Sequence, residues 1–140
     1  MEKITAAFTK GRRAVVTGQG GFGKTQIANE YTHRHIADYD FICWVNAESK
    51  QSLENSYREF AAENGMPLAL EGEFEPVLQF MKRWFVEYDS WLFIYDNAES
   101  LASTDDGLAS LSYYLPGATA TGNVLITVTR GRFHCHRARR

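Results

Sequence analysis

The sequence predicts an α/β fold in three layers, with helices on both faces of a mostly parallel sheet of about four strands. Four short apolar runs are continuous rather than alternating, which is typical of strands that are covered on both faces. The segments between them show helical spacing, and right-handed crossovers place such helices on both faces of a sheet. The apolar runs are AVVT (14–17), FICWV (41–45), WLFIY (91–95) and VLITV (124–128).

The connections between these runs are expected to be helical, because their apolar residues recur three and four positions apart. The first connection has such a stripe at Ile27, Ala28, Tyr31 and His35. The second connection has two stripes, at Leu53, Tyr57, Phe60 and Ala61 and at Val77, Phe80, Met81, Trp84 and Tyr88. A surface loop (64–76) is expected between those two helices, and a shorter helix (106–115) before the last run.

Composition limits the class of protein and its partners. The chain has 140 residues without a low-complexity tract or a clear repeat, which is typical of one globular domain. Residues 1–129 carry 10 Lys and Arg against 17 Asp and Glu, so this part has no general attraction to nucleic acid. No apolar stretch approaches the ~20 residues of a membrane span, and no secretory signal is visible. Cys43, expected in a buried strand, and Cys135 form no disulfide framework, so a cytoplasmic protein is expected.

The stretch GQGGFGKT (18–25) lies between the first apolar run and the first expected helix. It fits the pattern G-x-x-x-x-G-K-[ST], which requires a strand before it and a helix after it. Its glycines let successive backbone N–H groups form an anion-binding hollow at the helix N-terminus. Lys24 is expected to reach the β and γ phosphates of a nucleotide, and the Thr25 hydroxyl to bind Mg²⁺. The expected nucleotide contacts are Gly18, Gln19, Gly20, Gly21, Phe22, Gly23, Lys24, Thr25 and Gln26.

Two further candidates lie at the carboxyl ends of strands, where open α/β sheets bind their ligands. Asp96 ends the third run, and Mg²⁺ at a phosphate loop normally takes help from such an acid. An aspartate there can also simply begin a turn. Arg130 follows the fourth run and either senses the γ phosphate or is a solvated cation at the start of an Arg-rich tail. Thr25 and Asp96 are thus the candidate metal ligands, and Lys24, Asp96 and Arg130 the candidate catalytic residues.

Five segments in this order and spacing resemble the NB-ARC nucleotide-binding module, especially in bacterial regulatory proteins that carry tetratricopeptide repeats. The segments are VVTGQGGFGKTQIANEY, FICWVNAES, WLFIYDNAE, YLPG and GNVLITVTR. The resemblance covers residues 12–130, after a lead-in segment (1–11) and before a basic tail (131–140). NB-ARC modules belong to the signal-transduction ATPases with numerous domains (STAND), which generally act as ATP/ADP switches.

The resemblance implies a P-loop NTPase three-layer sandwich in which residues 18–25 are the Walker A loop. Asp96 becomes the Walker B acid, and Arg130 the arginine of the first sensor motif. The strand order of the family would place the run 124–128 between the runs 14–17 and 91–95, and the run 41–45 at one edge. The implied ligands are ATP or ADP with Mg²⁺.

Three departures from the family pattern modify these expectations. Asn97 follows Asp96 where many relatives have a second acid, and because an amide is no general base, hydrolysis should be slow or undetectable. The second departure is length, since the family continues with a fifth strand and further subdomains after the fourth strand. The sheet is therefore expected to be incomplete, and the strand at 14–17 to be an open edge that a protein partner or a second copy of the chain can pair with. The tail GRFHCHRARR does not resemble the continuation in the family, and whether it is native stays open.

Three classes of function therefore compete. The first is an ATP/ADP-binding switch module with slow or no hydrolysis, the second a true phosphotransferase or hydrolase, and the third an interaction fragment that no longer binds nucleotide. A GTPase is disfavoured, because the sequence contains no Asn-Lys-x-Asp motif. The choice of adenine rests on the resemblance, and neither a membrane nor a specific nucleic acid is an expected partner.

Overall fold

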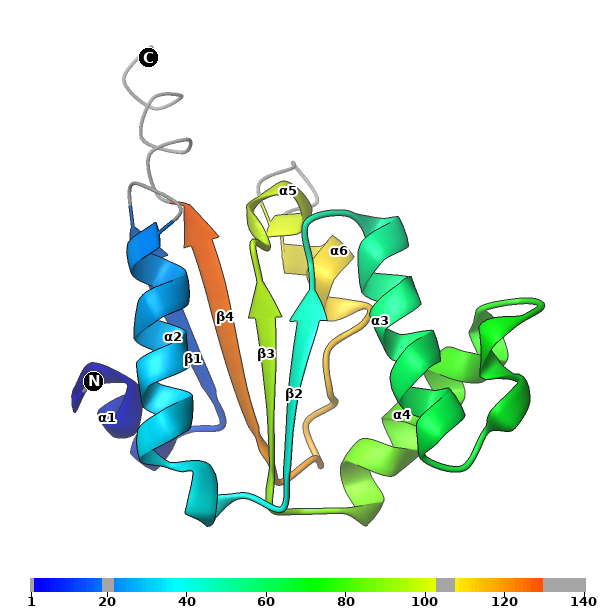
Figure 1. Ribbon diagram of the computed structural model, residues 1–140, viewed down its shortest axis with the longest axis horizontal. Coiled ribbons are helices and arrows are strands. Elements are labelled where there is room, and N and C mark those ends of the chain that lie inside the picture. The colour runs from blue at the N-terminus through cyan, green and yellow to red at the C-terminus, as the bar shows by residue number, and fades with distance from the viewer. Residues whose placement is uncertain (1, 19–21, 103–107, 130–140) are drawn as a thin grey trace, which may run out of the picture.

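The computed structural model describes residues 2–18, 22–102 and 108–129, and Figure 1 shows the arrangement of their helices and strands. Four parallel strands form one sheet in the order β1-β4-β3-β2. The strands are β1 (Arg13–Gly18), β2 (Phe41–Asn46), β3 (Trp91–Asp96) and β4 (Asn123–Thr129). The predicted α/β class with a parallel sheet is confirmed. The implied position of the fourth strand between the first and third is also confirmed.

Helices cover both faces of the sheet and make three layers (Figure 1). One layer contains α1 (Glu2–Lys10), α2 (Phe22–Arg34) and the 3₁₀ helix η1 (Ile36–Asp38). The opposite layer contains α3 (Lys50–Glu63), η2 (Pro67–Leu70), α4 (Glu75–Glu87) and α6 (Leu108–Ser112), while α5 (Glu99–Ala102) follows β3. The sequence patterns predicted α2, α3, α4 and α6 but not α1 or the short η1, η2 and α5. Within the described ranges, no helix is long and apolar enough to cross a membrane.

The alternation of side chains along the strands divides the core into two parts. On the α1/α2 face, Leu92 and Ile94 of β3 pack with Ala28 and Tyr31 of α2. On the α3/α4 face, the odd-numbered β3 residues join an aromatic cluster with Trp84 and Phe85 of α4. Residues 91–95 of β3 are fully buried, because this central strand is covered on both faces.

The outer strands differ from the prediction that all four runs are covered on both faces. In β1, Ala14 and Val16 are buried, but Val15 is 58% exposed, because α3 and α4 pack over β2 and β3 rather than over β1. In β2, Cys43 is only half-buried rather than buried as predicted. Both strands lie at edges of the sheet, where helices cover them incompletely. Ile27 is also exposed, since it lies beside the uncovered β1 edge.

The segment before β4 is fixed by side chains from three elements. The carbonyl oxygens of residues 114, 115 and 116 accept hydrogen bonds from Tyr57 of α3, Lys82 of α4 and Arg13 of β1, at 2.7, 2.6 and 3.0 Å in that order. Just after this segment, a Cβ atom at Gly122 would overlap with the indole of Trp91. These contacts fix where β4 enters the sheet, and thereby where its carboxyl end lies.

Candidate functional site

The candidate site lies where β1, β3 and β4 end and α2 begins, at the upper edge of the sheet in Figure 1. Gly18 is the last residue of β1, and α2 starts at Phe22. Parallel strands end at the same edge, so Asp96 at the end of β3 belongs to the same region. The predicted contacts Gln19, Gly20 and Gly21 and the candidate sensor Arg130 lie outside the described residues.

The N-terminus of α2 carries a charge pattern that favours an anion. Its first turn contains no acidic side chain, and His33 and Arg34 lie in its last turn. Because a helix has a partial positive charge at its N-terminus, a phosphate there is stabilised by the helix. Gly23 and Gln26 lie in these first two turns, and both are exposed.

Lys24 folds back from α2 onto the end of β1. Its side chain is 2% exposed, although lysines are almost never fully buried unless they are paired. A Cβ atom at Gly18 would lie 3.2 Å from Lys24 Cγ, so the lysine stem occupies the space that a side chain at position 18 would fill. The first glycine of the motif therefore has a visible purpose: it allows the cation to lie close to the start of the loop.

Thr25 and Asp96 come together from segments that are 71 positions apart in the sequence. Thr25 Oγ1 lies 3.4 Å from Asp96 Oδ1, which is long for a hydrogen bond between two oxygens. The structure thus brings together the two predicted metal ligands. Both residues are partly exposed.

The donor set fits Mg²⁺ bound together with a nucleotide. Among the described residues there is no cluster of three or more His, Cys, Asp or Glu side chains that could hold a metal ion on its own. Magnesium differs from zinc or calcium in that it typically uses only one or two carboxylates, with water and substrate phosphates completing its coordination. One hydroxyl and one carboxylate beside a phosphate loop therefore suit Mg²⁺.

Thr127 of β4 is a site residue that the sequence reasoning missed. It is fully buried, and its hydroxyl donates to Asp96 Oδ1 at 2.7 Å and accepts from the backbone N–H of Asn97 at 2.9 Å. Its carbonyl oxygen accepts from the N–H of Ala98 at 2.9 Å. Asn97 has a positive φ of 62°, a conformation in which asparagine is enriched. The signal that could have identified Thr127 is a polar residue inside the apolar run VLITV.

Behind Asp96, the hydroxyls of Tyr95 and Tyr57 are 2.6 Å apart in the α3/α4 core. Burial raises the pKa of both phenols above their ordinary value, so both stay neutral. They place no charge beside the Asp96 carboxylate, whose side chain points to the opposite face of the sheet.

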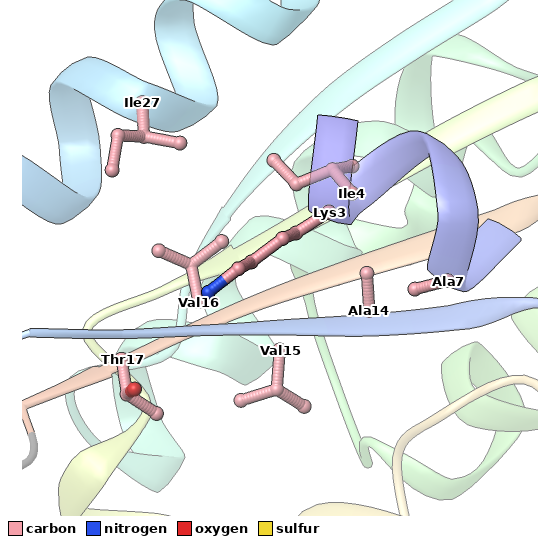
Figure 2. Close-up of a pocket in the computed structure, with 8 residues that line it drawn as sticks. All are labelled: Lys3, Ile4, Ala7, Ala14, Val15, Val16, Thr17 and Ile27. Atoms are coloured by element: carbon pink, nitrogen blue, oxygen red, sulfur yellow. The ribbon is translucent and has the colours of Figure 1, made fainter. Parts of the chain in front are cut away.

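A cavity of about 370 Å³ borders the site at the β1 edge. It is lined by Lys3, Ile4 and Ala7 of α1, Val16 and Thr17 of β1, and Ile27 of α2. Figure 2 shows the Lys3 side chain extending from α1 toward β1, with Ile27 on the far side of the cavity. Among these residues, Lys3 and Thr17 have polar side chains and the others have apolar side chains. The cavity thus adjoins the phosphate loop through Thr17, the residue before Gly18.

The comparisons with known proteins agree with this geometry at the level of the superfamily. No curated protein matches the chain. Residues 9–130, by contrast, match the family model of the AAA domain, which begins within α1 and ends one residue after β4. The match covers the phosphate loop, Asp96 and Thr127 together. Because it spans most of the sequence, the chain belongs to the AAA domain family of P-loop NTPases.

Proposed function

We propose that the chain is an ATP/ADP-binding switch module of the STAND type, with an NB-ARC nucleotide site and slow or no hydrolysis. AAA-type P-loop domains generally bind nucleotide with Mg²⁺, and the proposal adds the adenine base, the low turnover and the signalling role. One observation carries it. The buried Lys24 lies against Gly18, and the next residue, Thr25, brings its hydroxyl close to the Asp96 carboxylate.

Phosphate binding is supported by two independent features of α2. Its N-terminus has a partial positive charge, and Lys24 adds a full positive charge at the same end. Thr25 and Asp96 supply a hydroxyl and a carboxylate for the magnesium ion that accompanies the phosphates. Each of these groups matches one component of a magnesium nucleotide.

Slow turnover is supported by the residue that follows Asp96. Fast hydrolysis needs a group that orients or deprotonates the attacking water. Asn97 occupies the position where a second acid would stand, and its amide cannot act as a base. Its backbone N–H is already bonded to Thr127. The described part of the site is therefore better equipped to bind the nucleotide than to cleave it.

The cavity beside β1 is the proposed site of the adenine base. Its walls include the apolar side chains of Ile4, Val16 and Ile27, which suit the face of a planar base, and its position next to Thr17 connects it to the phosphate loop. In the resembled family, adenine contacts come partly from residues before the first strand. Here the corresponding residues form α1, which contributes Lys3, Ile4 and Ala7 to the cavity.

The test is calorimetric titration of the purified protein with ATP, ADP and GTP, with Mg²⁺ or with EDTA. We expect both adenine nucleotides to bind, GTP to bind more weakly, and Mg²⁺ to strengthen ATP binding. Lys24→Ala should weaken binding about 10- to 100-fold, because a hydrogen bond to a charged group contributes about 1.5–3 kcal/mol. Lys10→Ala, which removes an exposed lysine at the far end of α1, is the matched control. Equal affinity of the Lys24→Ala and Lys10→Ala variants would refute the assignment.

The exposed face of β1 favours a second candidate, an interaction module that pairs with a second copy of the chain. β1 is an edge strand, and the 58% exposed Val15 lies in its centre. Unpaired backbone groups at such an edge are a template for another strand. Light scattering after size exclusion should then show a dimer that Val15→Lys disrupts and that Val86→Lys, on exposed α4 surface, leaves intact. A wild-type monomer at high concentration would exclude this candidate.

A further inference from the structure

We propose that Thr127 is a positioning residue, which orients the Asp96 carboxylate toward magnesium-bound nucleotide. The inference rests on the proposed nucleotide binding and adds to it a residue on a different strand. It starts from a juxtaposition of β3 and β4. The register pairs Tyr95 with Ile126, so the next residues along the two strands, Asp96 and Thr127, lie side by side. Both side chains point to the face of the sheet that α2 covers.

The direction of each hydrogen bond at Thr127 is determined by the groups involved. A hydroxyl has a single proton and two lone pairs. Asn97 N–H can only donate, so it uses a lone pair of the hydroxyl at 2.9 Å. An ionised carboxylate can only accept, so the hydroxyl proton goes to Asp96 Oδ1 at 2.7 Å. Thr127 is thus a fixed donor to one chosen oxygen of the acid.

This bond restricts the one torsion that decides where the carboxylate oxygens point. The final torsion of an aspartate is broad and roughly two-fold, so an unrestrained carboxylate samples many orientations. Among the described residues, both hydroxyl contacts of Asp96 go to the same oxygen, and the Thr127 contact is 0.7 Å shorter than the 3.4 Å contact from Thr25. The threonine on the sheet therefore orients the acid.

The backbone around Asp96 is held by bonds that the Thr127 side chain does not make. The carbonyl oxygen of Asp96 accepts from the N–H of Ala47, just after β2, at 2.9 Å. The N–H of Ala98 donates to the carbonyl oxygen of Thr127, which any residue at position 127 would retain. Removing the hydroxyl also removes the bond from the Asn97 N–H, but these two backbone bonds remain, so we expect the carboxylate to be released while the end of β3 keeps its place.

Two variants separate orientation from simple packing. Thr127→Val keeps the shape of the side chain but removes the hydroxyl, whereas Thr127→Ser keeps the hydroxyl and removes a methyl group. The measured quantity is the magnesium gain, defined as the ratio of ATP dissociation constants in EDTA and in Mg²⁺, obtained by calorimetry. The melting temperature of each nucleotide-free variant is measured alongside. Thr127→Cys, which has similar size but donates only weakly, replaces the valine variant if the latter does not fold.

We expect Thr127→Val to lower the magnesium gain about 10-fold or more, as a lost hydrogen bond to a charged group implies, and Thr127→Ser to keep it. In an Asp96→Asn background, Thr127→Val should cause no further loss, because the two residues act as one unit. An unchanged magnesium gain in Thr127→Val, with a lower melting temperature in both variants, would overturn the inference and leave the proposed function intact. A wild-type protein that binds no nucleotide would overturn both.

Discussion

The space around Gly18 allows a prediction whose magnitude can be worked out from the structure. In Gly18→Ala, the new Cβ would lie 3.2 Å from Lys24 Cγ and 3.9 Å from Cδ. Carbon atoms pack best at about 3.5–4.0 Å, so the lysine stem must move by a few tenths of an ångström. Since Lys24 is 2% exposed, it has little room in which to move. The substitution should therefore displace the Lys24 ammonium group, which is proposed to bind the phosphates.

The cost to folding should be small. Overpacking costs about 1–3 kcal/mol, but the contact is made by a flexible stem, and replacing glycine restricts the unfolded chain by about 0.4–1 kcal/mol. We expect the free energy of unfolding to fall by about 1 kcal/mol at most. Nucleotide affinity should fall about 10-fold or more, since the displaced cation makes a charge-assisted bond.

The assay combines urea denaturation with calorimetric titration of ATP and Mg²⁺. Gly117→Ala is the matched control, because a Cβ atom at Gly117 meets nothing within 4 Å and the residue lies outside the phosphate loop. We expect Gly117→Ala to bind like the wild type. If Gly18→Ala folded and also bound ATP with wild-type affinity, the argument that Gly18 exists to accommodate Lys24 would be refuted.

Three further predictions concern turnover, packing and pH. Asn97→Asp should raise ATP turnover in a phosphate-release assay, because a carboxylate replaces the amide. Aspartate also tolerates the left-handed conformation of residue 97. Unchanged turnover would show that the amide is not what limits hydrolysis. Gly122→Ala should lower the free energy of unfolding by about 3 kcal/mol or more, because its Cβ would overlap with Trp91 and the neighbouring backbone must move; a wild-type urea midpoint would contradict this. Burial, together with the charges of Glu63 and Glu59, raises the pKa of the Cys43 thiol from 9.0 to about 12. The neutral thiol therefore stabilises the fold below pH 9, and this contribution is lost as the pH rises toward 12. Cys43→Val should therefore flatten the fall in stability between these pH values, and an unchanged slope would argue against it.

Much of the fold could be predicted because its signals are local. The phosphate loop is one contiguous stretch between an apolar run and a helical stripe, so its identity needs no tertiary information. The central strand β3 is a continuous apolar run, and its burial on both faces follows. The four-strand order came from the resemblance rather than from the residues, since the patterns of the runs do not say which strands are neighbours.

The rule that a continuous apolar run is covered on both faces was wrong for β1, because such a run does not distinguish a central strand from an edge strand. The exposure of Val15 depends on which elements pack over β1, and α3 and α4 lie elsewhere on that face. Ile27 fits the helical stripe equally well but lies beside the uncovered edge. The sequence patterns do not predict helix α1, whose Ile4 is buried against β1.

By itself, the sequence determined the fold class, the phosphate loop and the candidate ligands Lys24, Thr25 and Asp96, because periodicity and motif spacing are properties of neighbouring residues. The tertiary structure alone decided that Thr25 meets Asp96 and that Thr127 bonds the same carboxylate. Those contacts join residues 71 and 31 positions apart. Their geometry depends on the register between β3 and β4 and on the position of α2 over the sheet, which are set by packing between elements that no local pattern encodes.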